Sequence, residues 1–217
     1  MKYIVGRKLG MTQIFGDKGI VIPVTVVEAG PCVVTQIKTK EKDGYDAVQI
    51  GFEDAKKNAT NKPSAGLFKK AGVTPKKVLR EFRIDDNGTA EAPTYKLGDV
   101  IACDLFAVND IVDVTSKTKG HGFSGTIKRW NFHRQRMTHG NSRSHRVPGS
   151  VGSNSDPSRV FPGKKLPGQY GHEQVTIQNL TIAGVDKAKN CLLIKGGIPG
   201  PDGSLVGIRT AVKGGKK

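Results

Sequence analysis

Residues 116–172 read SKTKGHGFSGTIKRWNFHRQRMTHGNSRSHRVPGSVGSNSDPSRVFPGKKLPGQYGH, and this stretch determines how the rest of the chain is organised. It contains eleven lysines and arginines and a single acid, Asp156. All five histidines and the only tryptophan, Trp130, also lie in it. Such a segment has little apolar surface to bury, and its charges repel one another. We therefore expect that it does not fold compactly alone and that it pairs with a polyanion.

The sequence on both sides of this stretch has the pattern of β-strands. Runs rich in β-branched residues occur at 20–27, 32–37, 47–52, 78–84, 100–106 and 111–114, and again at 175–185, 191–195 and 205–210. Turn signals at 29–31, 42–44 and 86–88 separate the earlier runs, and the glycine-rich loop 196–203 is expected to be irregular. Short strands at this spacing are typical of a barrel or sandwich.

Each flank is incomplete alone, so we predict one mainly β domain, a barrel or sandwich, formed by residues 1–115 and 173–217. Residues 116–172 are then a long, irregular, basic extension inserted between two strands, because a loop of this length is expected only where it has a function. A small α/β insertion is predicted at 53–82. Within it, residues 61–70 have a helical pattern, with Pro63 in the first turn and Gly72 as the stop. The nearby lysines either solvate the helix or make a second contact with phosphate; they are Lys56, Lys57, Lys62, Lys69 and Lys70.

The composition limits the class of partner. A net charge of +16 favours nucleic acid or an anionic membrane surface. No apolar run is long enough for a transmembrane helix, and the first residues lack the features of a signal or transit peptide, so we expect a cytoplasmic protein. Cys32, Cys103 and Cys191 are far apart and each lies in an apolar run, which predicts reduced core thiols.

Residues 120–125, GHGFSG, match the dinucleotide-binding pattern G-x-G-x-x-G. That function requires a helix next and an acid about 20 residues further on, and no acid occurs before Asp156. We interpret the glycines instead as residues that allow tight turns and a close approach of the backbone to phosphate.

The five histidines do not have the spacing of a metal site. No cysteine lies among them, and no C-x-x-C or H-x-x-x-H pattern occurs. No pair of carboxylates accompanies them for acid–base or triad chemistry. We therefore expect no enzyme activity, no metal and no cofactor.

Nucleic acid remains the best match to this stretch. Lysine and arginine neutralise phosphates, and Trp130, Phe132, Phe161 and Tyr170 offer surfaces on which unpaired bases can stack. Trp130 could equally anchor the base of the loop. No helix-turn-helix, zinc finger or basic-region heptad is visible, which favours RNA over DNA. The predicted RNA-binding residues are Lys117, Lys119, His121, Lys128, Arg129, Trp130, His133, Arg134, Arg136, His139, Arg143, His145, Arg146, Ser153, Asn154, Arg159, Lys164, Lys165 and Gln169.

Several separated motifs, in order, resemble those of the bacterial large-subunit ribosomal protein L3 (uL3) family. They are the opening GRKLGMT at 6–12; Phe106, Asp113, Ser116 and Thr118 followed by Gly120, His121, Gly122, Gly125 and Arg129; SHRVPGS at 144–150; and GKK at 163–165 with Gly168 and Gln169.

The resemblance implies a β-barrel of the translation-protein type with a small helical insertion. It also implies binding to 23S rRNA near its 3′ end early in 50S assembly, and an extension whose tip, 149–158, approaches the peptidyl transferase centre. Neighbouring proteins would be L14, L19 and L13, in a cytoplasmic ribosome with no membrane or DNA partner. Many bacterial relatives carry a glutamine in the tip, which is methylated in some species, but Ser153 stands there in this chain, so we do not expect that modification.

Two alternatives fit less well. A soluble translation factor or RNA chaperone could share this type of barrel, but it would need a nucleotide or effector domain, and no G-x-x-x-x-G-K-[ST] motif occurs. A metal or dinucleotide enzyme lacks the ligands and acids described above.

Overall fold

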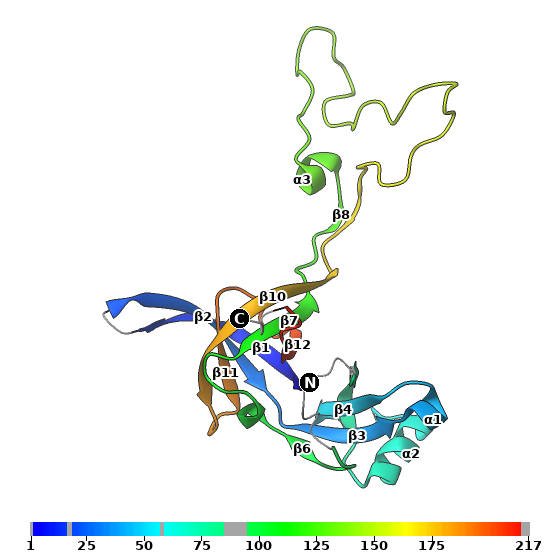
Figure 1. Ribbon diagram of the computed structural model, residues 1–217. Coiled ribbons are helices and arrows are strands. Elements are labelled where there is room, and N and C mark those ends of the chain that lie inside the picture. The colour runs from blue at the N-terminus through cyan, green and yellow to red at the C-terminus, as the bar shows by residue number, and fades with distance from the viewer. Residues whose placement is uncertain (1, 17–18, 57–58, 85–94, 214–217) are drawn as a thin grey trace. The chain divides into compact units, whose positions relative to one another are not determined.

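The computed structural model describes residues 2–16, 19–56, 59–84 and 95–213. Within these residues, six strands form a closed antiparallel barrel in the order β1, β12, β7, β10, β11, β2 (Figure 1). Their bounds are β1 Tyr3–Phe15, β2 Val21–Ala29, β7 Ile111–Lys117, β10 Gln174–Asp186, β11 Cys191–Lys195 and β12 Leu205–Thr210. Both flanks of the basic stretch supply barrel strands, and the predominance of strands confirms a mainly β fold.

A second, four-stranded sheet has the order β5, β4, β3, β6. Its strands are β3 Cys32–Lys38, β4 Ala47–Asp54, β5 Lys76–Arg83 and β6 Val100–Ile101. We expected residues 32–37 and 47–52 to belong to the barrel and the insertion to comprise only residues 53–82. The segment that lies outside the barrel is therefore longer than expected, because it begins at β3 and ends with β6. An apolar run identifies a strand but not its neighbours, because these depend on pairing between residues distant in sequence.

Three connections differ in detail from the expected turns and strands. The turn at 42–44 is the end of a short helix, α1 Lys40–Asp43, with Gly44 in the left-handed conformation at φ 82°. The run 100–106 is strand only in β6 and continues as a 3-10 helix, η2 Cys103–Leu105. The turn expected at 86–88 lies outside the described residues.

The predicted helix at 61–70 is present as α2, Lys62–Ala71. The Asn61 side chain caps its start by accepting a hydrogen bond from the Ser64 N–H at 3.1 Å, and Gly72 ends it with φ 67°. Phe68 is its only buried side chain. Its lysines are exposed, which is compatible with either solvation or a phosphate contact.

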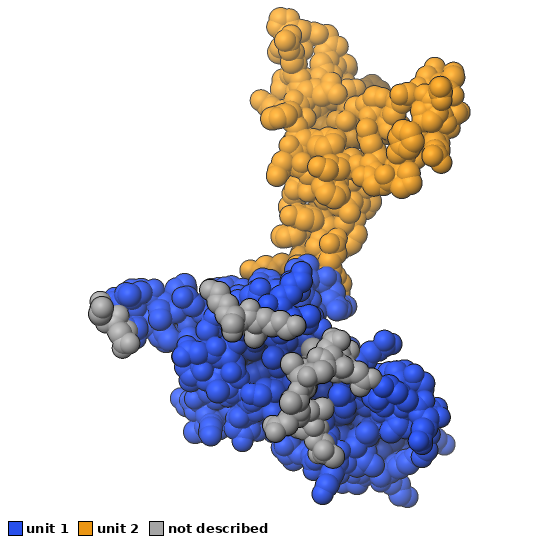
Figure 2. Space-filling view, in the orientation of Figure 1, with its two compact units in different colours: residues 1–117, 174–217 blue, residues 118–173 orange. Residues whose placement is uncertain are grey.

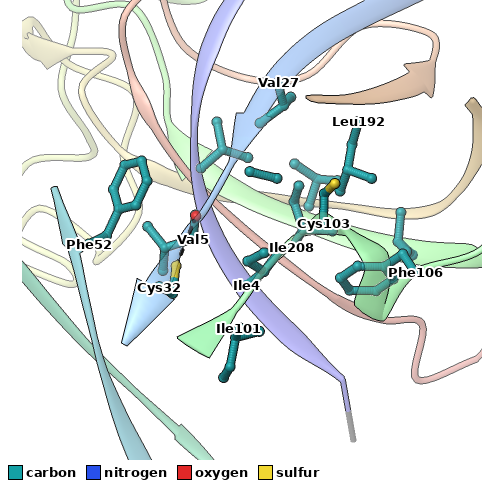
Figure 3. Packing of buried hydrophobic residues seen from close by; sticks show 14 of the residues in the cluster. Ile4, Val5, Val27, Cys32, Phe52, Ile101, Cys103, Phe106, Leu192 and Ile208 are labelled. Atoms are coloured by element: carbon teal, nitrogen blue, oxygen red, sulfur yellow. Dashed lines mark hydrogen bonds between the residues drawn. The ribbon is translucent and has the colours of Figure 1, made fainter. Parts of the chain in front are cut away.

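One hydrophobic core joins the barrel to the second sheet. Ile4, Ile182 and Ile208 of the barrel belong to the same buried cluster as Ile50 and Phe52 of β4, and Figure 3 shows Phe52 beside the barrel strands. Each fully buried side chain of this size contributes about 1.5–3 kcal/mol. The two sheets therefore fold as one body.

Two of the three expected core thiols, Cys32 and Cys103, belong to this cluster. Cys32 and Cys103 are buried, Cys191 is half-buried, and all three are free. Burial raises the pKa of Cys32 to about 11, which keeps it protonated at neutral pH.

The opening motif has a structural role in the barrel. A Cβ at Gly6 would run into the Glu28 backbone oxygen on β2, so only glycine lets β1 and β2 approach here. Lys8 is buried, and its Nζ donates to the Ile198 and Gly200 carbonyl oxygens at 3.2 and 2.9 Å. These bonds hold the loop 196–203, which is irregular as expected.

Buried polar contacts tie β7 to the strands beside it. Asp113 is fully buried, and its carboxylate accepts hydrogen bonds from the Asn179 and Val212 N–H groups at 3.1 and 3.2 Å. Arg209 Nη2 of β12 lies 3.6 Å from the same carboxylate. At the end of β7, Lys117 pairs with Gln174 of β10. The chain therefore leaves the barrel and returns to it at one cross-strand pair.

The chain divides into two units at this pair (Figure 2). The first comprises residues 1–117 and 174–217, and the second comprises 118–173. None of the helices in the described ranges is long and apolar enough to cross a membrane.

Candidate nucleic-acid interface

The second unit, 118–173, has regular structure only near its two ends. Strands β8 Gly122–Ser124 and β9 Gly168–Tyr170 form a two-stranded antiparallel sheet, in which Gly122 pairs with Tyr170. Helix α3, Thr126–Trp130, follows β8 and ends at Asn131, whose φ is 57°. Residues 131–167 contain no helix or strand (Figure 1). The predicted irregular extension therefore has an ordered stem, 118–130 and 165–173, and an irregular outer part.

Backbone contacts hold together the two limbs of the stem, the outgoing limb 118–130 and the returning limb 165–173. The Thr118 N–H donates to the Glu173 carbonyl oxygen at 2.9 Å, and the His121 N–H donates to the Tyr170 carbonyl oxygen at 2.8 Å. The rings of His121 and Tyr170 stack with centroids 4.8 Å apart. Gly171 has φ 70°, and a Cβ there would collide with the Lys119 backbone oxygen. This crossing of the limbs requires glycine.

Trp130 joins α3 to the returning limb. Its Nε1–H donates to the Leu166 carbonyl oxygen at 2.9 Å, and Arg129 Nη1 donates to the same oxygen at 3.1 Å. The Arg129 guanidinium lies 4.9 Å from the centre of the indole ring, and Lys165 Nζ lies 5.7 Å from it. Trp130 thus anchors the loop, one of the two roles considered for it, while the residue remains 37% exposed.

These contacts surround an open hollow of ≈ 390 Å³ in the stem. Four predicted RNA-binding residues line it: Lys119, His121, Arg129 and Trp130. The other lining residues, Thr118, Tyr170, Gly171 and Glu173, were not among the predicted site residues, although Tyr170 was expected to offer a stacking surface. Of these four residues, only Thr118 belongs to a motif named in the sequence analysis, and that motif does not predict a pocket. The four residues join the site only through the pairing of β8 with β9.

In the outer part, a local network shapes residues 135–145. The Arg136 carbonyl oxygen accepts a bond from Asn141 Nδ2 at 2.7 Å and lies 3.1 Å from His145 Nδ1. The Gln135 N–H donates to the His145 carbonyl oxygen at 3.0 Å. His139 lies between them with φ 58°, in the left-handed region. The backbone is therefore organised by polar contacts, which leaves the arginine heads at the surface.

The tip, 149–158, contains no base and one acid, Asp156. Ser150 Oγ donates to the Gly152 carbonyl oxygen at 2.9 Å, and Ser153 and Asn154 are exposed. Beyond the tip, the Arg159 guanidinium lies 5.4 Å from the centre of the exposed Phe161 ring. The tip thus differs in charge from the limbs on either side of it.

The glycine motif at 120–125 does not form a dinucleotide-binding turn. Its residues run through β8 of the two-stranded antiparallel sheet and into a helix of five residues, whereas that turn belongs to a βαβ unit. Across the described ranges, no three His, Cys, Asp or Glu side chains lie close enough to hold a metal ion.

Within the described residues, the positive charges of this unit have no acidic partners. Residues 118–173 contain ten lysines and arginines but only two acids. No ion pair between described residues involves any of these bases. Of the predicted RNA-binding residues, all are exposed except Arg129 and His145, which are half-buried; Lys117 belongs to β7 of the first unit. The arrangement offers many cationic donors to a polyanion.

Comparison with known proteins adds an independent finding. The family model described as ribosomal protein L3 matches residues 68–192. The chain is 53% identical over 215 residues to the large ribosomal subunit protein uL3 of Thermosipho melanesiensis, covering 99% of this chain and 100% of that protein. It is also 53% identical over 214 residues to the protein of the same name from Thermosipho africanus, with the same coverage.

Proposed function

Because the chain belongs to the ribosomal protein L3 family and is thus a structural constituent of the large ribosomal subunit, we propose that residues 118–173 bind 23S rRNA directly. This family consists of structural proteins and not of enzymes. Association with the ribosome and its RNA follows from membership. Which residues make the contact, and what the contact does, is the proposal.

The observation that carries this proposal is a difference between the two units in how their lysines and arginines are paired with acids. In the first unit, several bases have acidic partners, such as Arg7 with Glu53 and Lys38 with Glu81. In the second unit, no lysine or arginine forms an ion pair with an acidic side chain of the described residues. A like-charged, irregular segment gains most from a partner that supplies negative charge, and RNA supplies it along its whole backbone.

Binding by this unit requires the outer part, 131–164, to adopt one conformation. Ordering a flexible segment costs free energy, which phosphate contacts and base stacking offset. The predicted RNA-binding lysines and arginines from Lys119 to Arg146 and from Arg159 to Lys165 supply affinity, while the tip, which has no lysine or arginine, makes contacts that depend on shape.

The resemblance to the family supports finer assignments, which belong to the proposal. The barrel unit anchors the protein on 23S rRNA near its 3′ end and starts early 50S assembly. The tip, 149–158, approaches and supports the peptidyl transferase centre. L14, L19 and L13 are the neighbouring proteins, and the place of action is the cytoplasmic ribosome.

Ultraviolet cross-linking in purified large subunits tests the proposal. Mass spectrometry of the cross-linked peptides is expected to place most protein–RNA bonds within residues 118–173, with tip peptides bound to nucleotides of the peptidyl transferase centre. The lysine-rich helix α2 is the internal comparison, because it also exposes lysines and its role is undecided. Cross-links confined to α2 and the barrel would contradict the proposal.

A further inference from the structure

We propose that the hollow in the stem, lined by Lys119, His121, Arg129, Trp130, Tyr170 and Glu173, receives a single unpaired nucleotide of the bound RNA. This inference rests on the proposed function, since it specifies what one part of the RNA interface recognises. It distinguishes the stem from the remaining basic surface, where contacts to the phosphate backbone alone would suffice.

The size of the hollow suits a nucleotide. Its volume of ≈ 390 Å³ falls in the range of roughly 300–1,000 Å³ that is usual for small-molecule pockets. The base pairs of a double helix are stacked and cannot enter such a space. An unstacked base from a loop or bulge can enter it, and such bases are the usual targets of specific RNA recognition.

The chemistry of the lining also matches a nucleotide better than a bare phosphate. His121, Tyr170 and Trp130 offer aromatic surface, and Arg129 adds a planar guanidinium; all are surfaces on which bases stack. Lys119 and Arg129 provide positive charge for the phosphate. Glu173 would repel a free anion, but a carboxylate can accept a hydrogen bond from an N–H of a base.

The lining is already organised before RNA arrives. The stacked rings of His121 and Tyr170 are held by the β8–β9 pairing. Arg129 and Trp130 both donate to the Leu166 carbonyl oxygen. Side chains held in this way lose little conformational freedom on binding, so the stem can bind a base at a lower entropic cost than the outer part of the unit.

Trp130 makes the test direct, because it is the only tryptophan of the chain and lies in the hollow. The full-length protein is titrated with 23S rRNA while Trp130 emission is recorded, and binding is measured in parallel by filter retention. Base-specific chemical probing then compares free and bound RNA. We expect quenched emission upon binding, and one unpaired nucleotide whose base becomes protected.

Tyr170→Leu removes one ring from the lining but keeps an apolar side chain. It is expected to re-expose the protected base and to weaken RNA binding by roughly 5- to 150-fold, the range for loss of one stacked base. Phe123→Leu is the matched control: Phe123 is 79% exposed on β8 and does not line the hollow, so protection of that base should persist. The thermal unfolding temperature of each free variant reports whether it folds.

The outcomes separate the two proposals. Tight rRNA binding with unchanged Trp130 emission and no protected base would overturn the nucleotide pocket and leave the proposed function standing. Protection that survives in a folded Tyr170→Leu variant would also overturn the pocket. Absence of any rRNA binding by the wild-type chain would overturn the proposed function and the pocket with it.

Discussion

The ring of His121 stacks on the ring of Tyr170 with their centroids 4.8 Å apart and their planes 27° from parallel. The first residue lies on the limb that leaves the barrel, and the second lies on the limb that returns. The same two residues share a backbone hydrogen bond of 2.8 Å. Together with the β8–β9 pairing, this contact makes the stem an ordered part of an otherwise irregular unit.

Replacing His121 with alanine should loosen the stem without unfolding the barrel. The stacked pair contributes about 0.5–1.5 kcal/mol beyond its buried area, so the amides of β8 and β9 should exchange faster with deuterium by a factor of roughly 2–12. Hydrogen–deuterium exchange measures this. The amides of β7 serve as the internal control, and equal exchange of β8 in wild type and variant would show that the stack does not stabilise the stem.

Replacing arginines of the outer part with neutral residues should reduce the salt dependence of rRNA binding. With Arg134, Arg136, Arg143, Arg146 and Arg159 all changed to glutamine, the slope of log K against log salt should become shallower by about 3.5–4.5. Changing the exposed lysines Lys62, Lys69 and Lys70 of α2 to glutamine tests whether these lysines contact phosphate or only solvate the helix. A shallower slope there would identify a second phosphate contact, and an unchanged slope would identify solvating lysines. An unchanged slope in the arginine set would contradict contact between the outer part and phosphate.

Asp113→Asn should destabilise the barrel by about 1.5–3 kcal/mol, the cost of hydrogen bonds made to a charged group. The carboxylate accepts bonds from two backbone N–H groups and faces Arg209. An amide cannot satisfy both donors, because its nitrogen would meet one of them. Urea unfolding at pH 7 provides the measurement. Asp54→Asn is the comparison, since the Asp54 side chain is 73% exposed and forms an ion pair with Lys76. This substitution should lower the free energy of unfolding by less than about 1 kcal/mol. Equal losses would contradict the role assigned to burial.

Glu53→Gln should have an effect that depends on pH. Hydrogen bonds from Arg7, at 2.5 and 2.8 Å, hold the pKa of the Glu53 carboxyl below its ordinary value of 4.5, although burial opposes this. A lowered pKa stabilises the folded state above about pH 4.5, and this contribution is lost as the pH falls through the folded-state value. The variant should therefore be less stable than wild type at pH 7, by about 1 kcal/mol, and the difference should shrink below pH 4.5. Urea midpoints at a series of pH values measure it. A difference that stays constant down to pH 3 would show that the ion pair is not its cause.

Removing residues 118–173 should leave a folded barrel unit. Lys117 and Gln174 are cross-strand partners, so a two-residue Asn-Gly turn can join their strands as a hairpin. The shortened chain should unfold cooperatively, as followed by circular dichroism, but should bind rRNA with lower affinity and a smaller salt slope. Complete loss of cooperative unfolding would mean that the barrel requires the extension.

Much of the fold follows from local pattern. The strands 191–195 and 205–210 occur at the predicted positions, and helix α2 begins and ends near its predicted cap and stop. At residues 32–37 and 47–52, the sequence pattern predicted the strands but not the sheet to which they belong, since both lie in the second sheet. Whether β3 pairs with a barrel strand or with β4 and β6 depends on contacts between distant residues, which periodicity does not contain.

By itself, the sequence determined that two β-patterned flanks enclose a basic segment, since charge, strand propensity and turn residues are local properties. Its separated motifs also matched a ribosomal protein family, which the comparisons confirmed. Only the tertiary structure decided that this segment has an ordered stem and that Tyr170 and Glu173 lie in one hollow with Lys119 and Trp130. The physical reason is that strands β8 and β9, more than 40 residues apart, pair through backbone hydrogen bonds, which any residue but proline can supply and which therefore leave no mark in the sequence.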